Sequence, residues 1–210
     1  NGFSKESTKA FTEGMKKIRY YLGDEQTPTI GIGTQRSPEV DRQLKEFGYD
    51  VEALWRGEVE LDKDHAMAIS KDYSRQVKNQ IKKDIGIEAW NYLSYNQQIA
   101  LIDLGYNLGK NFLTPNVGAW KKMRAALVAK DPAKALLELQ FVDSNDRSKG
   151  ESKYWRGESA AGTTRGSINR REKVVKLWNT PSDVGKGATP QRERMHTNGW
   201  ITRYGIGMNP

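Results

Sequence analysis

The chain has 210 residues, which is enough for one large domain or two small lobes whose core needs no cross-links. It contains no cysteine and only two histidines, which excludes disulfide scaffolds, thiol nucleophiles and thiolate zinc sites and argues against histidine-rich metal sites. The net charge is +8, and the basic residues are spread along the chain, so we expect either an anionic partner or simply a soluble basic surface. No apolar run approaches the roughly 18 residues that span a bilayer.

The first part of the chain predicts a helix, a hairpin and a second, short helix. Residues 4–19 place apolar side chains at helical spacing. Residues 20–33 predict short strands joined by a polar Gly-Asp-Glu-Gln turn, in the manner of a β-hairpin. Pro38 then opens a short helix that ends at Gly48.

A long helix and a helical region follow. The long helix is expected from about 63 to 84, with Asp62 or Asp64 as its N-cap and an apolar residue at every fourth position. A helix of about 20 residues spans roughly 30 Å, which suits a strut between two lobes. The pattern of residues 90–178 is helical, except for a polar, Gly-rich and Ser-rich loop at 144–167.

Two acidic positions near the N-terminus suggest a catalytic pair. Glu13 lies at the apolar edge of the first predicted helix, and Asp24 lies on the wet hairpin turn. Cleavage of a glycosidic bond needs one carboxyl group that is protonated and a second that is ionised, in different environments. Thr29 begins a Thr-Ile-Gly-x-Gly strand, where its hydroxyl is suited to hold a water beside Asp24. The alternative is that these acids are a solvated helix charge and an ordinary turn residue.

The order Glu-Gly, acidic turn and Thr-Ile-Gly-x-Gly resembles the phage-type lysozymes, the muramidases of glycoside hydrolase family 24. Four later segments are also similar to that family: SPEVDRQLKEFG, LDKDHAMAISKDYSRQVKNQI, NQQIALIDLGYNLG and GSINRREKVVKLW. The resemblance implies an α+β, lysozyme-like two-lobe fold, in which a long helix joins a small β-hairpin lobe to a mostly helical lobe. The implied catalytic domain is 1–179, with a hairpin lobe at about 11–61, an interlobe helix at about 63–84 and a helical lobe at about 85–179; 180–210 is then a tail or linker.

The resemblance implies hydrolysis of the β-1,4 bond from N-acetylmuramic acid to N-acetylglucosamine in peptidoglycan. Glu13 is then the general acid, Asp24 the second carboxylate and Thr29 the residue that positions water. The family reaction is inverting, which requires room for that water between the carboxyl groups. Two departures stand out. The spacing between the acids is longer than in the family, which leaves Glu25 as a rival second carboxylate, and Thr34 stands where the family usually has histidine.

Three further residues match substrate-contacting positions of that family. Arg170 matches the arginine that pairs with the catalytic glutamate, and Tyr106 and Asn107 match residues on the cleft side of the core helix. His65 is expected to be exposed, and Trp155 either packs or stacks on a sugar ring. No metal or cofactor is expected. The expected partner is bacterial peptidoglycan, without nucleic acid and without stable membrane insertion.

The chain begins with Asn and shows no signal peptide, so we expect delivery to the periplasm and cell wall by another route. That route is release from the host cytoplasm late in a phage infection, or carriage as part of a virion, with residues 180–210 contacting other virion proteins. Two alternatives stay open. One is a lytic transglycosylase, which needs one acid and no activated water. The other is a non-catalytic wall-binding or structural virion module of the same fold.

Overall fold

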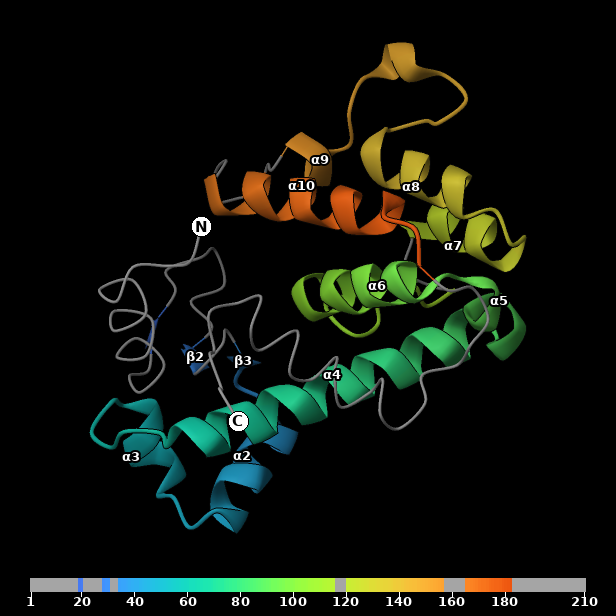
Figure 1. The fold of residues 1–210 in the computed structure, drawn as a ribbon. Helices are drawn as coiled ribbons and strands as arrows, with labels where there is room; N and C mark the ends of the chain where they lie inside the picture. Colours follow the sequence, from blue (N-terminus) through green and yellow to red (C-terminus); the bar gives the residue numbers. More distant parts are fainter. Residues whose placement is uncertain (1–18, 21–27, 31–33, 116–119, 157–164, 183–210) are drawn as a thin grey trace. The chain divides into compact units, whose positions relative to one another are not determined.

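The computed structural model describes residues 19–20, 28–30, 34–115, 120–156 and 165–182, with the backbone alone at 19–20, 28–29, 153–154 and 165–170. The chain divides into two compact units, a first unit that includes the residues up to Tyr73 and a second unit, Ser74–Thr189. The described part is mostly helical with short strands, which is an α+β composition as predicted (Figure 1). The helix predicted over 4–19 lies outside the described residues.

The first unit contains a three-stranded antiparallel sheet in the order β1-β2-β3. Its strands are β1 (Arg19–Tyr20), β2 (Pro28–Ile30) and β3 (Thr34–Gln35). Thr29, in the middle of the central strand, lies opposite Arg19 on one side and Gln35 on the other. This pairing confirms the predicted hairpin and adds a third strand. Ile30 is 2% exposed and anchors the sheet in the core of the unit.

Two short helices follow the sheet. The first, α2 (Pro38–Glu46), is capped by the Ser37 hydroxyl, and Gly48 follows it with φ +86°, as the sequence predicted. The second, α3 (Val51–Trp55), was not predicted; the Asp50 carboxylate caps it. One cluster of buried side chains joins the sheet, both helices and the start of α4. It comprises Ile30, Val40, Leu44, Val51, Leu54, Trp55, Leu61, Ala66 and Ile69.

The long helix α4 (Lys63–Ile85) agrees with the predicted 63–84. Of the two candidate caps, Asp62 caps it: its Oδ1 accepts hydrogen bonds from the backbone N–H groups of Asp64 (2.8 Å) and His65 (3.3 Å). These bonds favour the ionised carboxylate and lower the pKa of Asp62. The predicted apolar stripe faces the interior, with Ile69, Val77 and Ile81 buried and Tyr73 half-buried.

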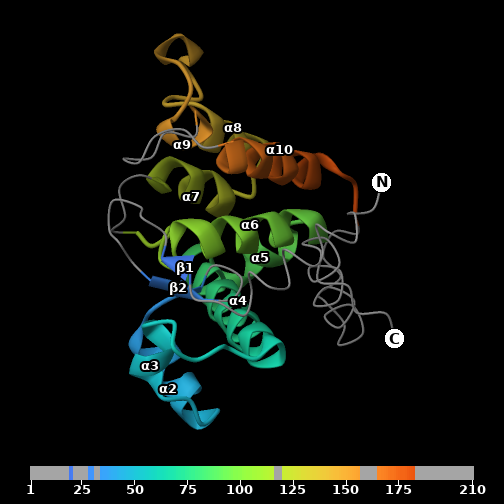
Figure 2. The same ribbon diagram turned by 90° about the vertical axis from the view of Figure 1, so that its left-hand side faces the viewer.

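The second unit is helical. It contains α5 (Ile87–Tyr92), α6 (Tyr95–Leu108), α7 (Lys121–Val128), α8 (Pro132–Gln140), the 3-10 turn η2 (Arg147–Lys149), α9 (Lys153–Arg156) and α10 (Arg165–Asn179). Within this unit α6 is central: α7, α8 and α10 lie on one side of it, and α5 and the last turns of α4 lie on the other (Figures 1 and 2). None of the described helices is long and apolar enough to cross a membrane.

Helix α6 is capped at its N-terminus and lies very close to α4 near its middle. Ser94 and Gln97 form a reciprocal capping box at its N-terminus. Further along, a Cβ added to Gly105 would lie 2.5 Å from Cγ1 of Val77 on α4, so only glycine permits this approach. The contact fixes the position of the following turn, which contains Tyr106.

The chain beyond α10 remains attached to α6. The backbone N–H of Asn96 donates to the Ser182 hydroxyl (3.0 Å), and the Asn96 side-chain amide donates to the carbonyl of Thr180 (3.0 Å). Contact with the rest of the second unit therefore extends past residue 179, the predicted end of the catalytic domain.

Candidate functional site

The residues predicted to carry the chemistry fall mostly outside the described part of the chain. Glu13, Asp24 and the rival Glu25 all lie there, so their geometry stays a prediction. Thr29 is described by its backbone, at the centre of β2 with a hydrogen-bonded strand on each side. A residue at such a position has little backbone freedom, which suits the role predicted for its hydroxyl.

A buried pair of hydroxyl groups connects the sheet to α4. Thr34 of β3 is 4% exposed, and its Oγ1 lies 3.3 Å from the Oγ of Ser70, which is 7% exposed. Thr34 is the position where the resembled family usually has histidine. Two hydroxyls do not titrate near neutral pH, so this connection between sheet and helix is independent of pH in that range. Sequence reasoning missed Ser70; the signal that could have found it is its place as a polar residue directly after Ile69 of the apolar stripe.

The last turn of α6 carries two of the predicted substrate-binding residues. Asn107 is exposed, and its amide Nδ2 donates to the carbonyl of Asp103 in the preceding turn. Tyr106 is half-buried. Gly109, with φ +90°, ends the helix directly afterwards. Asn107 thus keeps an amide oxygen that can accept a hydrogen bond, and Tyr106 precedes it on the same turn.

Arg171, the second of the paired arginines of α10, lies near the tryptophan of α9. Arg171 is 8% exposed, and its guanidinium lies 5.6 Å from the centre of the Trp155 ring. Its Nε has no hydrogen-bond partner in the described part of the chain. Arg171 is therefore an interior residue of the second unit, and the half-buried Trp155 packs against it. The side chain of Arg170 lies outside what is described, so its proposed pairing with Glu13 stays a prediction.

Histidine 65 differs from the prediction, which had it exposed. Its ring is half-buried and stacks on Phe47 with centroids 4.3 Å apart, and its Nδ1 lies 2.9 Å from the hydroxyl of Tyr49. That hydroxyl also accepts the backbone N–H of Asp62 (2.9 Å), so Tyr49 connects the His65 ring to the start of α4. The sequence expectation was wrong because Phe47, just beyond α2, covers the ring.

Asp84, at the end of α4, is a buried carboxyl group. It is 7% exposed, and Gln80 donates to its Oδ1 (2.8 Å), while Oδ2 has no partner among the described atoms. Burial raises the pKa of Asp84. Arg124 binds the Asp84 backbone carbonyl (2.9 Å) rather than completing a side-chain ion pair. The carboxyl therefore lacks the full set of partners that an ionised buried acid needs.

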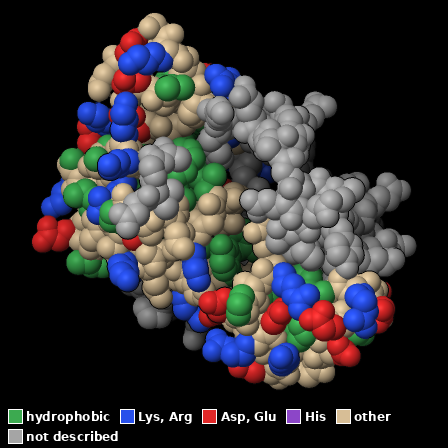
Figure 3. All heavy atoms as spheres, turned by 180° about the vertical axis from the view of Figure 1, so that it is seen from behind, with side chains coloured by type: hydrophobic (Ala, Val, Ile, Leu, Met, Phe, Trp, Pro, Cys, Tyr) green, Lys and Arg blue, Asp and Glu red, His purple; other side chains and the backbone are tan. Residues whose placement is uncertain are grey.

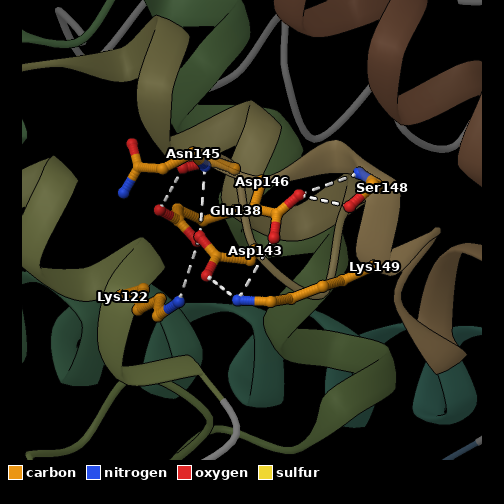
Figure 4. Close-up of polar contacts among 8 residues, drawn as sticks. Lys122, Glu138, Asp143, Asn145, Asp146, Ser148 and Lys149 are labelled. Carbon is orange, nitrogen blue, oxygen red and sulfur yellow. Dashed lines mark hydrogen bonds and ion pairs between the residues drawn. The ribbon is translucent and has the colours of Figure 1, made fainter.

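The loop between α8 and α9 is closed by a charged cluster (Figure 4). Asp143 binds the ammonium groups of Lys149 (3.0 Å) and Lys122 (3.4 Å). The hydrogen bond from Lys149, followed by that from the backbone N–H of Asn145, lowers the pKa of Asp143 to about 2. Beside it, the Ser144 hydroxyl donates to Glu138. Since these carboxylates have their partners within the loop and its neighbours, the cluster stabilises the loop rather than offering a reactive group.

Charge is distributed unevenly between the two units. Ser74–Thr189 contains 20 Lys and Arg against 11 Asp and Glu, a formal net charge of +9. Residues 34–73, the longest described stretch of the first unit, contain 6 Lys and Arg against 10 Asp and Glu, a formal net charge of −4. On the face in Figure 3 the basic side chains are spread out, with acidic ones among them. The described residues include no group of three His, Asp or Glu side chains able to hold a metal ion.

Comparison of the chain with protein-family models finds no match. A search of curated proteins finds no significant match. The resemblance to the phage-type lysozymes therefore rests on the sequence motifs themselves, from the Glu-Gly of Glu13 to the paired arginines at Arg170.

Proposed function

We propose that the chain is a peptidoglycan hydrolase, an N-acetylmuramidase with a lysozyme-like two-lobe fold. The observation that carries the proposal is the order of Glu13, an acidic turn and Thr29-Ile-Gly-x-Gly, with Thr29 on the central strand of an antiparallel sheet. The short helix after the sheet, the acid-capped α4 and the closing helix α10 follow in the order that the resemblance requires. We infer a phage-encoded, bacteriolytic enzyme that acts on the cell wall, with its C-terminal segment available to other virion proteins.

In this mechanism Glu13 donates its proton to the glycosidic oxygen as the bond from that oxygen to the muramic acid C1 breaks. Asp24, or Glu25 in its place, accepts a proton from a water held by Thr29, and the water oxygen bonds to C1 from the opposite face. The configuration at C1 inverts, and the products are two free sugar ends. Arg170 pairs with Glu13 and holds it in place. Tyr106 and Asn107 contact the glycan.

The decisive experiment measures clearing of permeabilised Gram-negative cells by the wild type and by Glu13→Gln, Asp24→Asn and Glu25→Gln. Glu13→Gln should abolish clearing, and one of the two turn variants should reduce it by at least tenfold. Glu60→Gln, a change of an exposed carboxylate in the described region, is the matched control and should clear like wild type. Clearing by Glu13→Gln at the wild-type rate would refute the assignment of the acid.

The altered spacing between the acids favours a second candidate, a non-catalytic wall-binding module of the same fold. It predicts that the purified protein sediments with peptidoglycan and never clears it. Mass spectrometry of digested peptidoglycan separates the remaining rival. Reducing N-acetylmuramic acid ends indicate hydrolysis, whereas 1,6-anhydro ends indicate a lytic transglycosylase.

A further inference from the structure

The hydroxyl pair of Thr34 and Ser70 lies on the buried face of the sheet in the first unit. Thr34 is directly opposite Ile30 of β2, and directly opposed residues of an antiparallel pair lie on the same face. The two residues are 4% and 2% exposed. Ile30 belongs to the same buried cluster as Ile69, the residue before Ser70. This face of the sheet therefore packs toward α4, and the contact of Thr34 Oγ1 with Ser70 Oγ (3.3 Å) is part of that packing.

The backbone ladder alone specifies the register of β2 and β3 only weakly. In the described residues these strands share two pairs, Thr29 with Gln35 and Ile30 with Thr34. So short a ladder has few hydrogen bonds, and the side chains then decide which residues face the core. A shift of β3 by one residue would turn the exposed Gln35 inward and Thr34 outward. The buried Thr34 therefore favours the observed register, in which Gln35 lies opposite Thr29.

The part of α4 that carries Ser70 is held within the first unit. Ile69 is 1% exposed, and Asp72 accepts a hydrogen bond from Gln43 of α2 (2.8 Å). A buried hydroxyl that loses its partner costs free energy, which keeps Thr34 and Ser70 together. Each of these two residues makes at least one further interaction as well. The pair thus joins β3 to a fixed point on α4.

The backbone of Thr29 depends on this connection. Thr29 precedes Ile30, which is anchored in the core, and it pairs with Gln35, which follows Thr34. A group that holds a catalytic water must be placed within about 0.5 Å of its productive position. A displacement of about 1 Å can reduce the rate by roughly 100-fold. Contacts that fix β3 on α4 are therefore able to control the predicted chemistry without touching the substrate.

We propose that Thr34 and Ser70 are positioning residues for the water that Thr29 holds. This inference rests on the proposed function, because it assigns the pair to the water-activating half of that reaction. The two hydroxyls act through β3 and β2, and they are buried away from the substrate. Their removal should therefore lower kcat and leave KM nearly unchanged, since KM reports glycan contacts elsewhere.

The first test measures kcat and KM on soluble, un-cross-linked peptidoglycan strands by the release of reducing ends. Thr34→Val and Thr34→Val/Ser70→Ala should lower kcat by about tenfold or more, with KM within about twofold of wild type. Thr34→Ser keeps the hydroxyl and should restore kcat to within about threefold of wild type. The matched control is Thr114→Val, which removes a hydroxyl that donates to the Asn111 carbonyl (3.0 Å) in the second unit. It should behave like wild type.

The second test needs no activity. Amide hydrogen exchange of the full chain should be about tenfold faster or more in β2 and β3 of Thr34→Val/Ser70→Ala, and unchanged in α6. All rates are compared at a temperature at which thermal melts show each variant to be folded. Thr34→Ser should exchange like wild type, because it retains the hydroxyl that contacts Ser70.

Wild-type kcat in the folded double variant would show that the pair is merely structural and would overturn the proposal. Unchanged exchange in β2 and β3 would overturn it as well, and so would a loss of kcat in Thr34→Ser equal to that in Thr34→Val. If the wild type releases no reducing ends, the proposed function fails, and the exchange rates still decide whether the pair fixes the strand of Thr29. Failure of the proposed function and failure of this inference therefore give different results.

Discussion

Replacement of Gly105 by alanine tests whether the close contact of α6 with α4 controls the stability of the helical unit. Intrinsic helix propensity favours alanine over glycine by about 1 kcal/mol. The added methyl group, however, would lie 2.5 Å from Cγ1 of Val77 and 3.1 Å from Cε1 of Phe112. Since carbon atoms prefer a separation of about 3.5–4.0 Å, Val77 or the helix must move by about 1 Å.

Val77 cannot move away easily. It is fully buried, and its branched side chain has one strongly preferred rotamer in a helix. Overpacking of this kind costs about 1–3 kcal/mol. After the gain in propensity is subtracted, Gly105→Ala should lower the free energy of unfolding by about 1 kcal/mol.

Urea unfolding followed by tryptophan fluorescence measures this change. Asn79→Ala, on an exposed face of α4, is the matched control and should raise stability by a few tenths of a kcal/mol through propensity alone. In a Val77→Ala background the space opens, so Gly105→Ala should become stabilising there. The reasoning is refuted if Gly105→Ala stabilises the wild type, or if its effect is the same in both backgrounds.

Three further predictions concern single side chains. Burial raises the pKa of Asp84, so the contribution of this carboxyl group to the free energy of unfolding is complete below its unfolded-state pKa and is lost as pH rises through its folded-state pKa. Thermal melts should therefore show that Asp84→Asn gains stability over wild type from pH 3 to pH 7. A constant difference between the two proteins would contradict this. Asp143 has a pKa lowered to about 2, so Asp143→Asn should be less stable than wild type at pH 7, and the difference should disappear as pH falls from 4 to 2. Ser94→Ala removes the cap of α6 and should cost about 1 kcal/mol in urea unfolding; a variant as stable as wild type would contradict the capping box.

Local sequence features set the helix boundaries that were predicted well. Pro38 starts α2 as expected, and the Ser37 hydroxyl caps it; Asp131 with Pro132 starts α8 in the same way, because a cap and its helix lie within a few residues of each other. Asp62 was one of two candidates for the cap of α4, and the hydrogen bonds decide between them. Such signals depend on short-range geometry, which the sequence contains directly.

The short helix α3 was missed for a physical reason. A helix of five residues has little intrinsic stability, because forming its first turn is unfavourable. Leu54 and Trp55 stabilise it by entering the core of the first unit, where they are 0% and 2% exposed. No local pattern reveals that a distant surface will cover these two side chains.

The catalytic hypothesis for this chain came from the sequence, because the order of Glu13, the acidic turn and Thr29 is a pattern along the chain. Other features were decided only by the tertiary structure: Thr29 belongs to a central strand, Arg171 lies inside against Trp155, and His65 is half-buried against Phe47 and Tyr49. Each of these depends on contacts between segments far apart in the sequence. Composition and spacing specify which side chains are present, but burial and hydrogen-bond partners, which set their charge and exposure, exist only once the chain has folded.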